Sequence, residues 1–297
     1  MDGILLIDKP EGFTSHDVVA RLRRILKTKR IGHTGTLDPF ATGVLVMLVG
    51  KATRLAQFVD KDEKEYVALV RFGSKTDTGD RTGQVVERNE GGVPELSEIL
   101  PRFVGDIEQV PPMYSAKKIA GKKLYEIARG GGEVERKALT VSISELELID
   151  PAEIWPGSAI EATDVGIRVV CSAGTYIRTL AEDIGKAAGT VAHLAELRRT
   201  RAGEFSLDGA VLLGNLAEMT DPSAALRPLS EAVAHLPDFT VEADRIEPTR
   251  SGLSTSSGAE SFEAGGFVRM VNGGGELIAI GVADTQENLI RPKIVLR

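Results

Sequence analysis

The sequence predicts an α+β fold, in which strand-like and helical segments alternate along the chain. Short apolar runs with the length of buried strands, such as residues 44–49, recur throughout. Between them lie segments with helical apolar spacing, such as residues 15–26. Hydrophobic residues make up 42% and charged residues 27% of the 297 positions, which is ordinary for a globular chain with a real core. The length allows one large domain and a small one, and we expect them at 1–234 and 235–297.

The N-terminal part of the chain begins with a strand and a basic helix. Residues 4–7 read as a strand, and Gly12 marks the turn after it. Ser15 is the expected N-cap of a helix whose polar face is basic and suited to contact an RNA backbone. A short helix is expected at 52–59, and the apolar alternation of 66–72 predicts a strand.

The middle of the chain has weaker periodicity. Residues 73–83, rich in Thr, Asp and Gly, are expected to form a surface loop. We expect a helix at 96–103, an extended segment at 109–118 because paired prolines exclude a helix, and another helix from 121 onward. Lysines and tyrosines lie close together in this part of the chain, as in proteins that hold unpaired RNA.

The second half of the chain returns to clear signals. Strands are expected at 139–149 and 165–171, with a loop between them, and Gly174 and Thr175 should cap a helix that follows. Further helices are expected at 193–199 and 226–234. Residues 239–297 have a glycine-rich, strand-like texture that predicts a small β-rich unit, with strands at 267–271, 277–281 and 294–296.

The most unusual stretch of the chain is residues 32–45. It holds three glycines, a histidine, an aspartate and a proline, so it cannot form a regular helix or strand. Pro39 fixes its own φ and favours an extended conformation at Asp38. An Asp-Pro turn that caps a helix is the ordinary alternative. The histidine and threonines around Asp38 favour a stiff functional loop at the mouth of the strand at 44–49.

The distribution of charge favours a phosphate-rich substrate despite the net charge of −7. A charge run is usually only a solvated face, but here three basic clusters flank candidate site segments. Their members are Arg21, Arg23, Arg24, Lys27, Lys29 and Arg30; Lys117, Lys118, Lys122 and Lys123; and Arg198, Arg199 and Arg201.

The cysteine and histidine content and the hydropathy argue against disulfide-bonded, zinc-binding and membrane-spanning proteins. A single cysteine, Cys171, excludes an internal disulfide, and four scattered histidines show no zinc spacing. We therefore expect no metal and no other cofactor. No leader-like or membrane-length apolar segment is visible, so a cytoplasmic protein without a membrane partner is expected. Nothing indicates a coiled coil, and we expect a monomer.

Residues 32–45 resemble the catalytic motif of the bacterial tRNA pseudouridine-55 synthase family, the TruB-type pseudouridine synthases. Further motifs of that family follow the same order in this chain, at residues 6–15, 64–66, 110–124 and 171–180. The resemblance implies a catalytic domain with a mixed, mainly antiparallel sheet flanked by helices. It also implies, more loosely, that 235–297 form a β-rich, PUA-like RNA-binding domain.

The same resemblance implies roles for individual residues. Asp38 is the expected nucleophile, and Arg178 is expected to pair with it and keep it ionised. Tyr66 is expected to stack on the flipped base and to help remove the proton from C5. The substrate-binding set comprises His33 (base extrusion), Leu197 (the uracil pocket), Tyr176, Lys9, Lys117, Lys122 and Lys123. Lys9 is expected to be more structural than chemical, because its motif braces the catalytic loop.

The implied reaction isomerises uridine 55 in the TΨC arm, the T stem-loop, of tRNA. The N1 glycosidic bond breaks, uracil rotates and a C5 glycosidic bond forms, without a redox change or an energy source. The sequence leaves open whether Asp38 attacks C6 or C1′, or stabilises a glycal route. An alternative is a catalytically inactive tRNA-binding or folding module, although Asp38, Tyr66 and Arg178 are all present. A third reading, a hydrolase with an aspartate nucleophile, is disfavoured because the sequence shows no second catalytic carboxylate at motif spacing.

Overall fold

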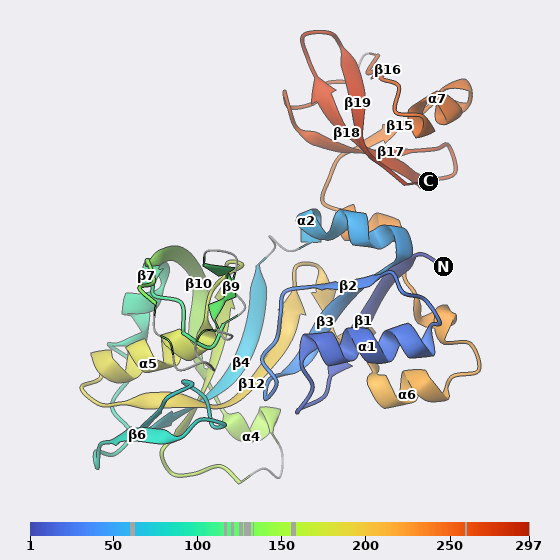
Figure 1. Ribbon diagram of the computed structural model, residues 1–297. Helices are drawn as coiled ribbons and strands as arrows, with labels where there is room; N and C mark the ends of the chain where they lie inside the picture. Colours follow the sequence, from blue (N-terminus) through green and yellow to red (C-terminus); the bar gives the residue numbers. More distant parts are fainter. Residues whose placement is uncertain are drawn as a thin grey trace.

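The computed structural model describes residues 1–59, 63–115, 118–119, 122–124, 127, 132, 134–155, 159–258 and 260–296 (Figure 1). Its main feature is a ten-stranded sheet with the order β14-β1-β3-β12-β4-β11-β10-β7, in which β2 pairs with β3 and β13 with β12. The strands are β1 (Gly3–Lys9), β2 (Ile31–Thr34), β3 (Thr42–Val49), β4 (Lys64–Phe72), β7 (Gly105–Gln109), β10 (Leu139–Ile149), β11 (Asp164–Cys171), β12 (Ala192–Ala202), β13 (Phe205–Ser206) and β14 (Val211–Leu212).

Most neighbouring strands in this sheet are antiparallel. Two pairs, β1 with β14 and β3 with β12, are parallel. The prediction of a mixed, mainly antiparallel sheet is therefore confirmed. The β3–β12 pair joins only Arg198 to Thr42 and Arg199 to Gly43. The two halves of the sheet, one with β1–β3 and the other with β4 and β10–β12, meet at this short contact (Figure 1).

Helices cover the sheet because β1 and β3 bury alternate side chains on both faces. Leu5, Leu45 and Met47 belong to the apolar cluster that contains α1 (Ser15–Ile25) and α5 (Ile177–Ala187). Their neighbours Ile4, Leu6 and Val46 belong to a second cluster with η1 (Gly50–Leu55) and α2 (Ala56–Val59). The other helical segments are η2 (Leu100–Phe103), α4 (Pro151–Ile154), η3 (Leu207–Gly209), α6 (Leu213–Glu218), η4 (Pro222–Ala225), η5 (Leu229–Val233), η6 (Ala243–Arg245) and α7 (Ile246–Arg250).

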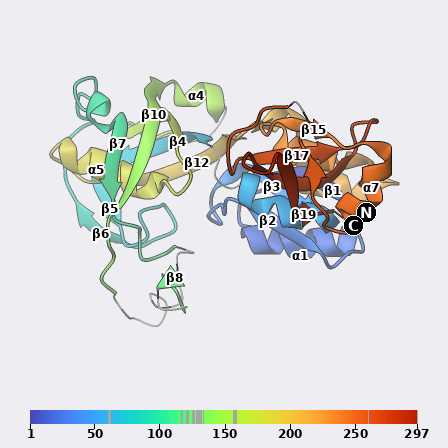
Figure 2. The same cartoon turned by 90° about the horizontal axis from the view of Figure 1, so that it is seen from above.

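The C-terminal part forms a second, five-stranded sheet, which confirms the predicted β-rich unit. Its strand order is β15-β17-β18-β19-β16. These strands are β15 (Asp238–Thr240), β16 (Thr255–Ser256), β17 (Phe267–Val271), β18 (Leu277–Asp284) and β19 (Leu289–Val295). Figure 2 shows this sheet lying over the β1–β3 half of the main sheet, to the side of β4 and β10. The Phe58 and Phe267 rings meet edge-to-face at 5.0 Å across this contact. Two small hairpins complete the strands, β5 (Ser74–Thr76) with β6 (Val85–Arg88), and β8 (Lys118–Ile119) with β9 (Lys122–Lys123).

The prediction of a helix at 193–199 is wrong, because this segment belongs to the central strand β12. Its Ala, Leu, Glu and Arg residues have good helix propensity, which misleads a local reading. The strand pairs with β4 on one side and β3 on the other, and this pairing overrides local preference. In a strand, Leu197 and Arg199 lie two positions apart and share a face.

Three other expected helices differ from the structure. At 96–103 only the 3₁₀ segment η2 forms, because Pro101 cannot donate a backbone hydrogen bond inside an α-helix. The connecting helix expected at 226–234 is likewise the short 3₁₀ segment η5, which begins directly after Pro228. Lys122 and Lys123, expected at a helix start, form β9 instead. Among the described residues, no helix is long and apolar enough to cross a membrane.

Candidate active site

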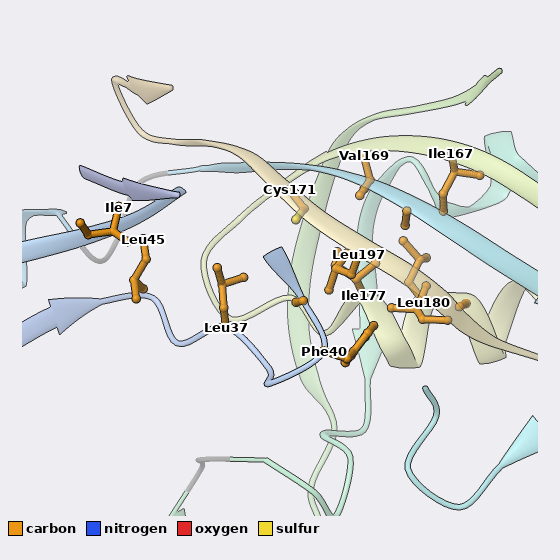
Figure 3. Close-up of a cluster of buried hydrophobic side chains, with 14 of the residues drawn as sticks. Ile7, Leu37, Phe40, Leu45, Ile167, Val169, Cys171, Ile177, Leu180 and Leu197 are labelled. Carbon is orange, nitrogen blue, oxygen red and sulfur yellow. The ribbon is translucent and has the colours of Figure 1, made fainter. Parts of the chain in front are cut away.

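The loop between β2 and β3 carries Asp38 and is fixed by its two apolar neighbours. Leu37 and Phe40 are each only 3% exposed, and Figure 3 shows both in the cluster that also contains Ile177 and Leu197. Ser15 Oγ accepts a hydrogen bond from Leu37 N at 3.0 Å and contacts Leu37 O at 3.3 Å. Asp38 therefore sits on a rigid loop.

Thr14, not the expected Ser15, caps α1. Its side chain accepts from the Asp17 N–H, while the Asp17 carboxylate accepts from the Thr14 N–H, which makes a reciprocal capping box. This arrangement leaves the Ser15 hydroxyl to hold the Leu37 backbone. The helix start and the catalytic loop are thus tied together.

Lys9 holds the other side of the same loop. It is fully buried, and its ammonium donates to the carbonyl oxygens of Pro10 (3.0 Å), Phe13 (2.7 Å) and Pro39 (3.2 Å). Burial lowers its pKa to about 8, so the side chain remains mainly protonated at neutral pH. Three hydrogen bonds are all that an ammonium can donate. This geometry agrees with the bracing role expected of Lys9, whose place among the substrate-binding residues stays a prediction.

Asp38 makes a two-point ion pair with Arg178. The Arg178 Nε lies 2.9 Å from Oδ2, and Nη2 donates to Oδ1 at 3.1 Å. Arg178 is almost fully buried and also donates to the carbonyl oxygens of Thr78 (2.8 Å) and Tyr114 (2.7 Å). Its Nη1 lies 3.7 Å from the buried carboxylate of Asp80. The expected Asp38–Arg178 partnership is present.

Asp80 belongs to residues 73–83, for which the sequence predicts a surface loop. Instead, residues 74–76 form β5, and Asp80 is 5% exposed. Its Oδ1 accepts hydrogen bonds from the hydroxyls of Thr78 and Thr82, so the carboxylate is held toward Arg178.

The electrostatics of Asp38 reflect a balance of opposing effects. Removal from water raises the pKa of the Asp38 carboxyl, and the nearby charge of Asp80 acts in the same direction. The guanidinium of Arg178 and the ammonium of Lys9 oppose this increase, but the net pKa lies above the ordinary value. Arg178 therefore offsets part of the cost of burying a charged aspartate.

Tyr66 reaches the same place from β4. It is half-buried, packs against the main apolar cluster and is paired in register with Arg199 of β12. Burial raises the pKa of the Tyr66 hydroxyl, while the positive charge of Arg199 opposes the increase.

The backbone of Tyr176 is held by the side chain of Gln109, and the side chain of Tyr176 does not cap α5. The Gln109 amide accepts from Tyr176 N at 2.9 Å and donates to Tyr176 O at 3.3 Å. Tyr176 is the N-cap position of α5 (Ile177–Ala187), directly after the expected cap at Gly174 and Thr175.

These residues surround one pocket of about 350 Å³. Five residues predicted from the sequence line it: Asp38, Tyr66, Tyr176, Arg178 and Leu197. The pocket is also lined by Lys64, Ser115 and Arg199, to which the sequence analysis gives no individual site role. Lys64 lies in the same motif as Tyr66, two residues before it. A strand prediction for 192–202 would have pointed to Arg199, because it would share a face with Leu197, two positions earlier.

Of the other predicted residues, His33 is not among those that line the pocket. His33 is half-buried on β2 beside β3, and its ring meets that of His16 edge-to-face at 5.9 Å. Lys117 lies outside the described residues, and Lys122 and Lys123 are described only as the strand β9. Cys171 is a buried strand residue whose thiol pKa is raised by burial to about 11, which disfavours a thiolate. In the described part of the chain, no three His, Cys, Asp or Glu side chains are grouped to hold a metal.

Comparisons with known proteins agree with this fold. Residues 23–177 match "TruB family pseudouridylate synthase (N terminal domain)", and residues 178–234 match "tRNA pseudouridylate synthase B C-terminal domain". The tRNA pseudouridine synthase B of Bordetella avium is 49% identical over 241 residues, covering 80% of this chain and 95% of the relative. That of Geobacillus thermodenitrificans is 42% identical over 306 residues, covering 100% of both chains.

A solved structure shares the same architecture. The structure of an H/ACA RNP bound to a substrate RNA containing 2′-deoxyuridine includes a chain that is 28% identical, with a TM-score of 0.75 over 99% of this chain and 85% of that one. The shared fold and the matched domains define the class as pseudouridine synthases, which are isomerases. Within that class, this chain belongs to the TruB family of pseudouridylate synthases.

Proposed function

We propose that this protein converts uridine 55 in the T stem-loop of tRNA to pseudouridine, with Asp38 as the nucleophile. The observation that carries the proposal is the Asp38–Arg178 ion pair in the wall of a pocket of about 350 Å³, beside Tyr66. Relatives that are called tRNA pseudouridine synthase B align over the whole chain, which supports tRNA as the substrate.

The proposed reaction begins when the target base leaves the RNA stack. Extrusion costs a few kcal/mol, and less in a strained loop. His33 assists at this step. The uracil then enters the pocket, where Leu197 supplies an apolar wall that is 5% exposed.

Asp38 then acts in its ionised form, oriented by the two Arg178 contacts. It attacks C6 or C1′, or stabilises a glycal intermediate. The N1–C1′ bond breaks, the base rotates and C5 bonds to C1′. Tyr66 stacks on the base and helps remove the C5 proton, while N1 gains a proton, so the product is an isomer of the substrate.

The rest of the tRNA is proposed to lie across basic surface. Arg21 and Arg24 are exposed on α1, the helix whose start is tied to the Asp38 loop. Lys117, Lys122 and Lys123 are proposed to add phosphate contacts. The protein is proposed to act as a monomer.

We divide the chain into a catalytic domain, 1–234, and a PUA-like RNA-binding domain, 235–297. The second sheet begins at Asp238 and has its own apolar cluster around Phe239, Val268 and Ile290, which supports this boundary.

The test is tritium release from tRNA transcripts that carry [5-³H]uridine. The wild-type protein should release tritium, whereas Asp38→Asn should bind the RNA but release none. A transcript changed at the T-loop uridine should also release none. Asp183→Asn is a matched control, because Asp183 is a half-buried aspartate on α5 that does not line the pocket. Tight tRNA binding without release by the wild type would instead favour the inactive binding module.

A further inference from the structure

Arg199 is a buried charge at the active site for which the mechanism above has no role. It is 1% exposed, lines the pocket and lies in register with Tyr66 across the β4–β12 pair. Its Nε donates to Val44 O at 2.8 Å. Its guanidinium lies near the Tyr66 hydroxyl, and its buried Nη2 makes no well-formed hydrogen bond in the part of the chain that the structure describes.

The catalytic loop and the start of β3 both lie directly against Arg199. A Cβ on Gly35 would lie 2.9 Å from Arg199 Nη1, and a Cβ on Gly43 would lie 2.1 Å from Arg199 O. Both glycines also have positive φ, 65° and 104°. Only glycine therefore fits at these two positions: Gly35 lets the loop approach the Arg199 guanidinium, and Gly43 lets β3 approach the Arg199 backbone.

A buried guanidinium in this position is costly unless its Nη2 finds an acceptor. Burial of a charged group is tolerated when the group is fully hydrogen-bonded, and a missing partner is penalised. The same pocket holds a second buried polar atom, Ser115 Oγ, which lies near the Tyr176 hydroxyl but makes no well-formed hydrogen bond among the described residues. Two buried polar atoms without a well-formed hydrogen bond in one pocket indicate a ligand that is itself polar.

We propose that Arg199 is a catalytic residue whose Nη2 donates to a carbonyl oxygen of the flipped uracil. This inference rests on the proposed function. The depth of Arg199 favours the base over the RNA phosphates, because the base is the part of the nucleotide that enters the pocket. Uracil offers two such acceptors, O2 and O4.

The contact supports catalysis because negative charge develops on the base. If Asp38 adds to C6, the C5=C6 electron pair moves toward O4. If the N1–C1′ bond breaks first, its electron pair stays on N1 and is shared with the adjacent O2 as well as O4. A preorganised positive donor at either oxygen stabilises the transition state more than the ground state. Arg199 therefore serves the chemical step, while Arg178 orients the nucleophile.

The test combines a single-atom change in the RNA with a change in the protein. tRNA is prepared with 2-thiouridine or 4-thiouridine, labelled with tritium at C5, at the target position. Sulfur is a weaker hydrogen-bond acceptor than oxygen. The wild-type protein should release tritium more slowly from one of the two thio substrates, and that substrate identifies the contacted carbonyl.

Arg199→Gln should lower the single-turnover rate on unmodified tRNA by roughly 10²–10³-fold, as for loss of an oxyanion donor. This variant should show no additional slowing with the thio substrate that slows the wild type. If the thio effect is equally large in Arg199→Gln, or if neither thio substrate slows the wild type, the proposal is overturned.

Two further variants separate this contact from a structural role. Arg199→Lys keeps the charge and the aliphatic stem, so the same comparison can be made if Arg199→Gln does not fold. It should show a reduced thio effect. Arg71→Gln removes a partly buried arginine that pairs with Asp164 on the same sheet, and it should retain the full wild-type thio effect. Failure of the wild type to release tritium from unmodified tRNA overturns the proposed function as well, whereas normal release with no Arg199-dependent thio effect overturns only this inference.

Discussion

Arg178 contacts both carboxylate oxygens of Asp38, through Nε at 2.9 Å and Nη2 at 3.1 Å. The same guanidinium donates to the backbone of Thr78 and Tyr114. Because the backbone contacts fix the plane of the guanidinium, the carboxylate is held in one orientation before any substrate enters.

Arg178→Lys is expected to lower the single-turnover rate on the order of 10²-fold, because a lysine ammonium cannot reproduce the planar two-point contact. The rate is measured by tritium release at saturating protein, alongside the tRNA dissociation constant, which should change much less. Arg71→Lys, which disrupts the Arg71–Asp164 pair at 2.7 Å, is the control for loss of a guanidinium elsewhere in the sheet. If Arg178→Lys kept the wild-type rate, the two-point contact between Arg178 and Asp38 would not be needed to orient the carboxylate.

Asp80→Asn is expected to shift the acidic limb of the pH–rate profile to lower pH. Asp38 must be ionised to act, so the rate rises as the pH passes above its pKa. Burial and the charge of Asp80 raise that pKa, and the wild-type limb should therefore lie above the reference value of about 3.9 for an aspartate. Removing the Asp80 charge lowers the pKa of Asp38.

The maximal rate of Asp80→Asn should also fall, because Asp80 lies 3.7 Å from Arg178 and helps to hold it. The asparagine keeps an oxygen for Thr78 and Thr82. Single-turnover rates at several pH values, with Asp183→Asn in parallel, provide the measurement. An unchanged limb, or a shift to higher pH, would contradict the electrostatic role of Asp80.

Lys9→Met is expected to destabilise the protein by about 1–3 kcal/mol, because it removes a fully buried ammonium that donates to three backbone carbonyl oxygens. The affected carbonyls are those of Pro10, Phe13 and Pro39. Urea unfolding at pH 7 measures the change. Lys51→Met is the matched control, since Lys51 is 35% exposed and its ion pair with Asp2 spans 3.7 Å. Equal stabilities for the two variants would show that Lys9 does not brace the loop.

The Asp38 loop was predictable because its signals are local. Glycine and proline restrict the backbone wherever they occur, and an Asp-Pro pair within a glycine-rich stretch excludes regular structure regardless of tertiary contacts. The apolar runs of β3, β4 and β11 were predictable for the same reason, since each carries its own pattern.

Arg199 was not predictable as a pocket residue because its position depends on distant strands. The composition of β12 favours a helix, and only pairing with β3 and β4 makes it a strand. Asp80 was missed likewise, because a polar Thr-Asp-Gly sequence reads as exposed until Arg178 of α5 is placed against it. The local sequence thus identified the nucleophile, whereas its charged surroundings come from tertiary structure.

Tyr66→Phe tests whether the Tyr66 hydroxyl takes part in chemistry or the ring only stacks. The ring packs against the apolar cluster, and phenylalanine would preserve that packing. Only the hydroxyl, which lies near Arg199, is lost. If it helps to remove the C5 proton, the rate of tritium release should fall by roughly 10²–10⁴-fold, as for loss of a general base, while tRNA affinity stays nearly constant.

Tyr176→Phe is the comparison for Tyr66→Phe, because it removes a second hydroxyl from the same pocket without changing Tyr66. It should retain much more of the rate. A Tyr66→Phe variant that only binds tRNA more weakly, with an unchanged rate once saturated, would assign Tyr66 to stacking. Proton removal from C5 would then require another base, and since Asp38 is the carboxylate among the described residues that line the pocket, it would be the next group to test.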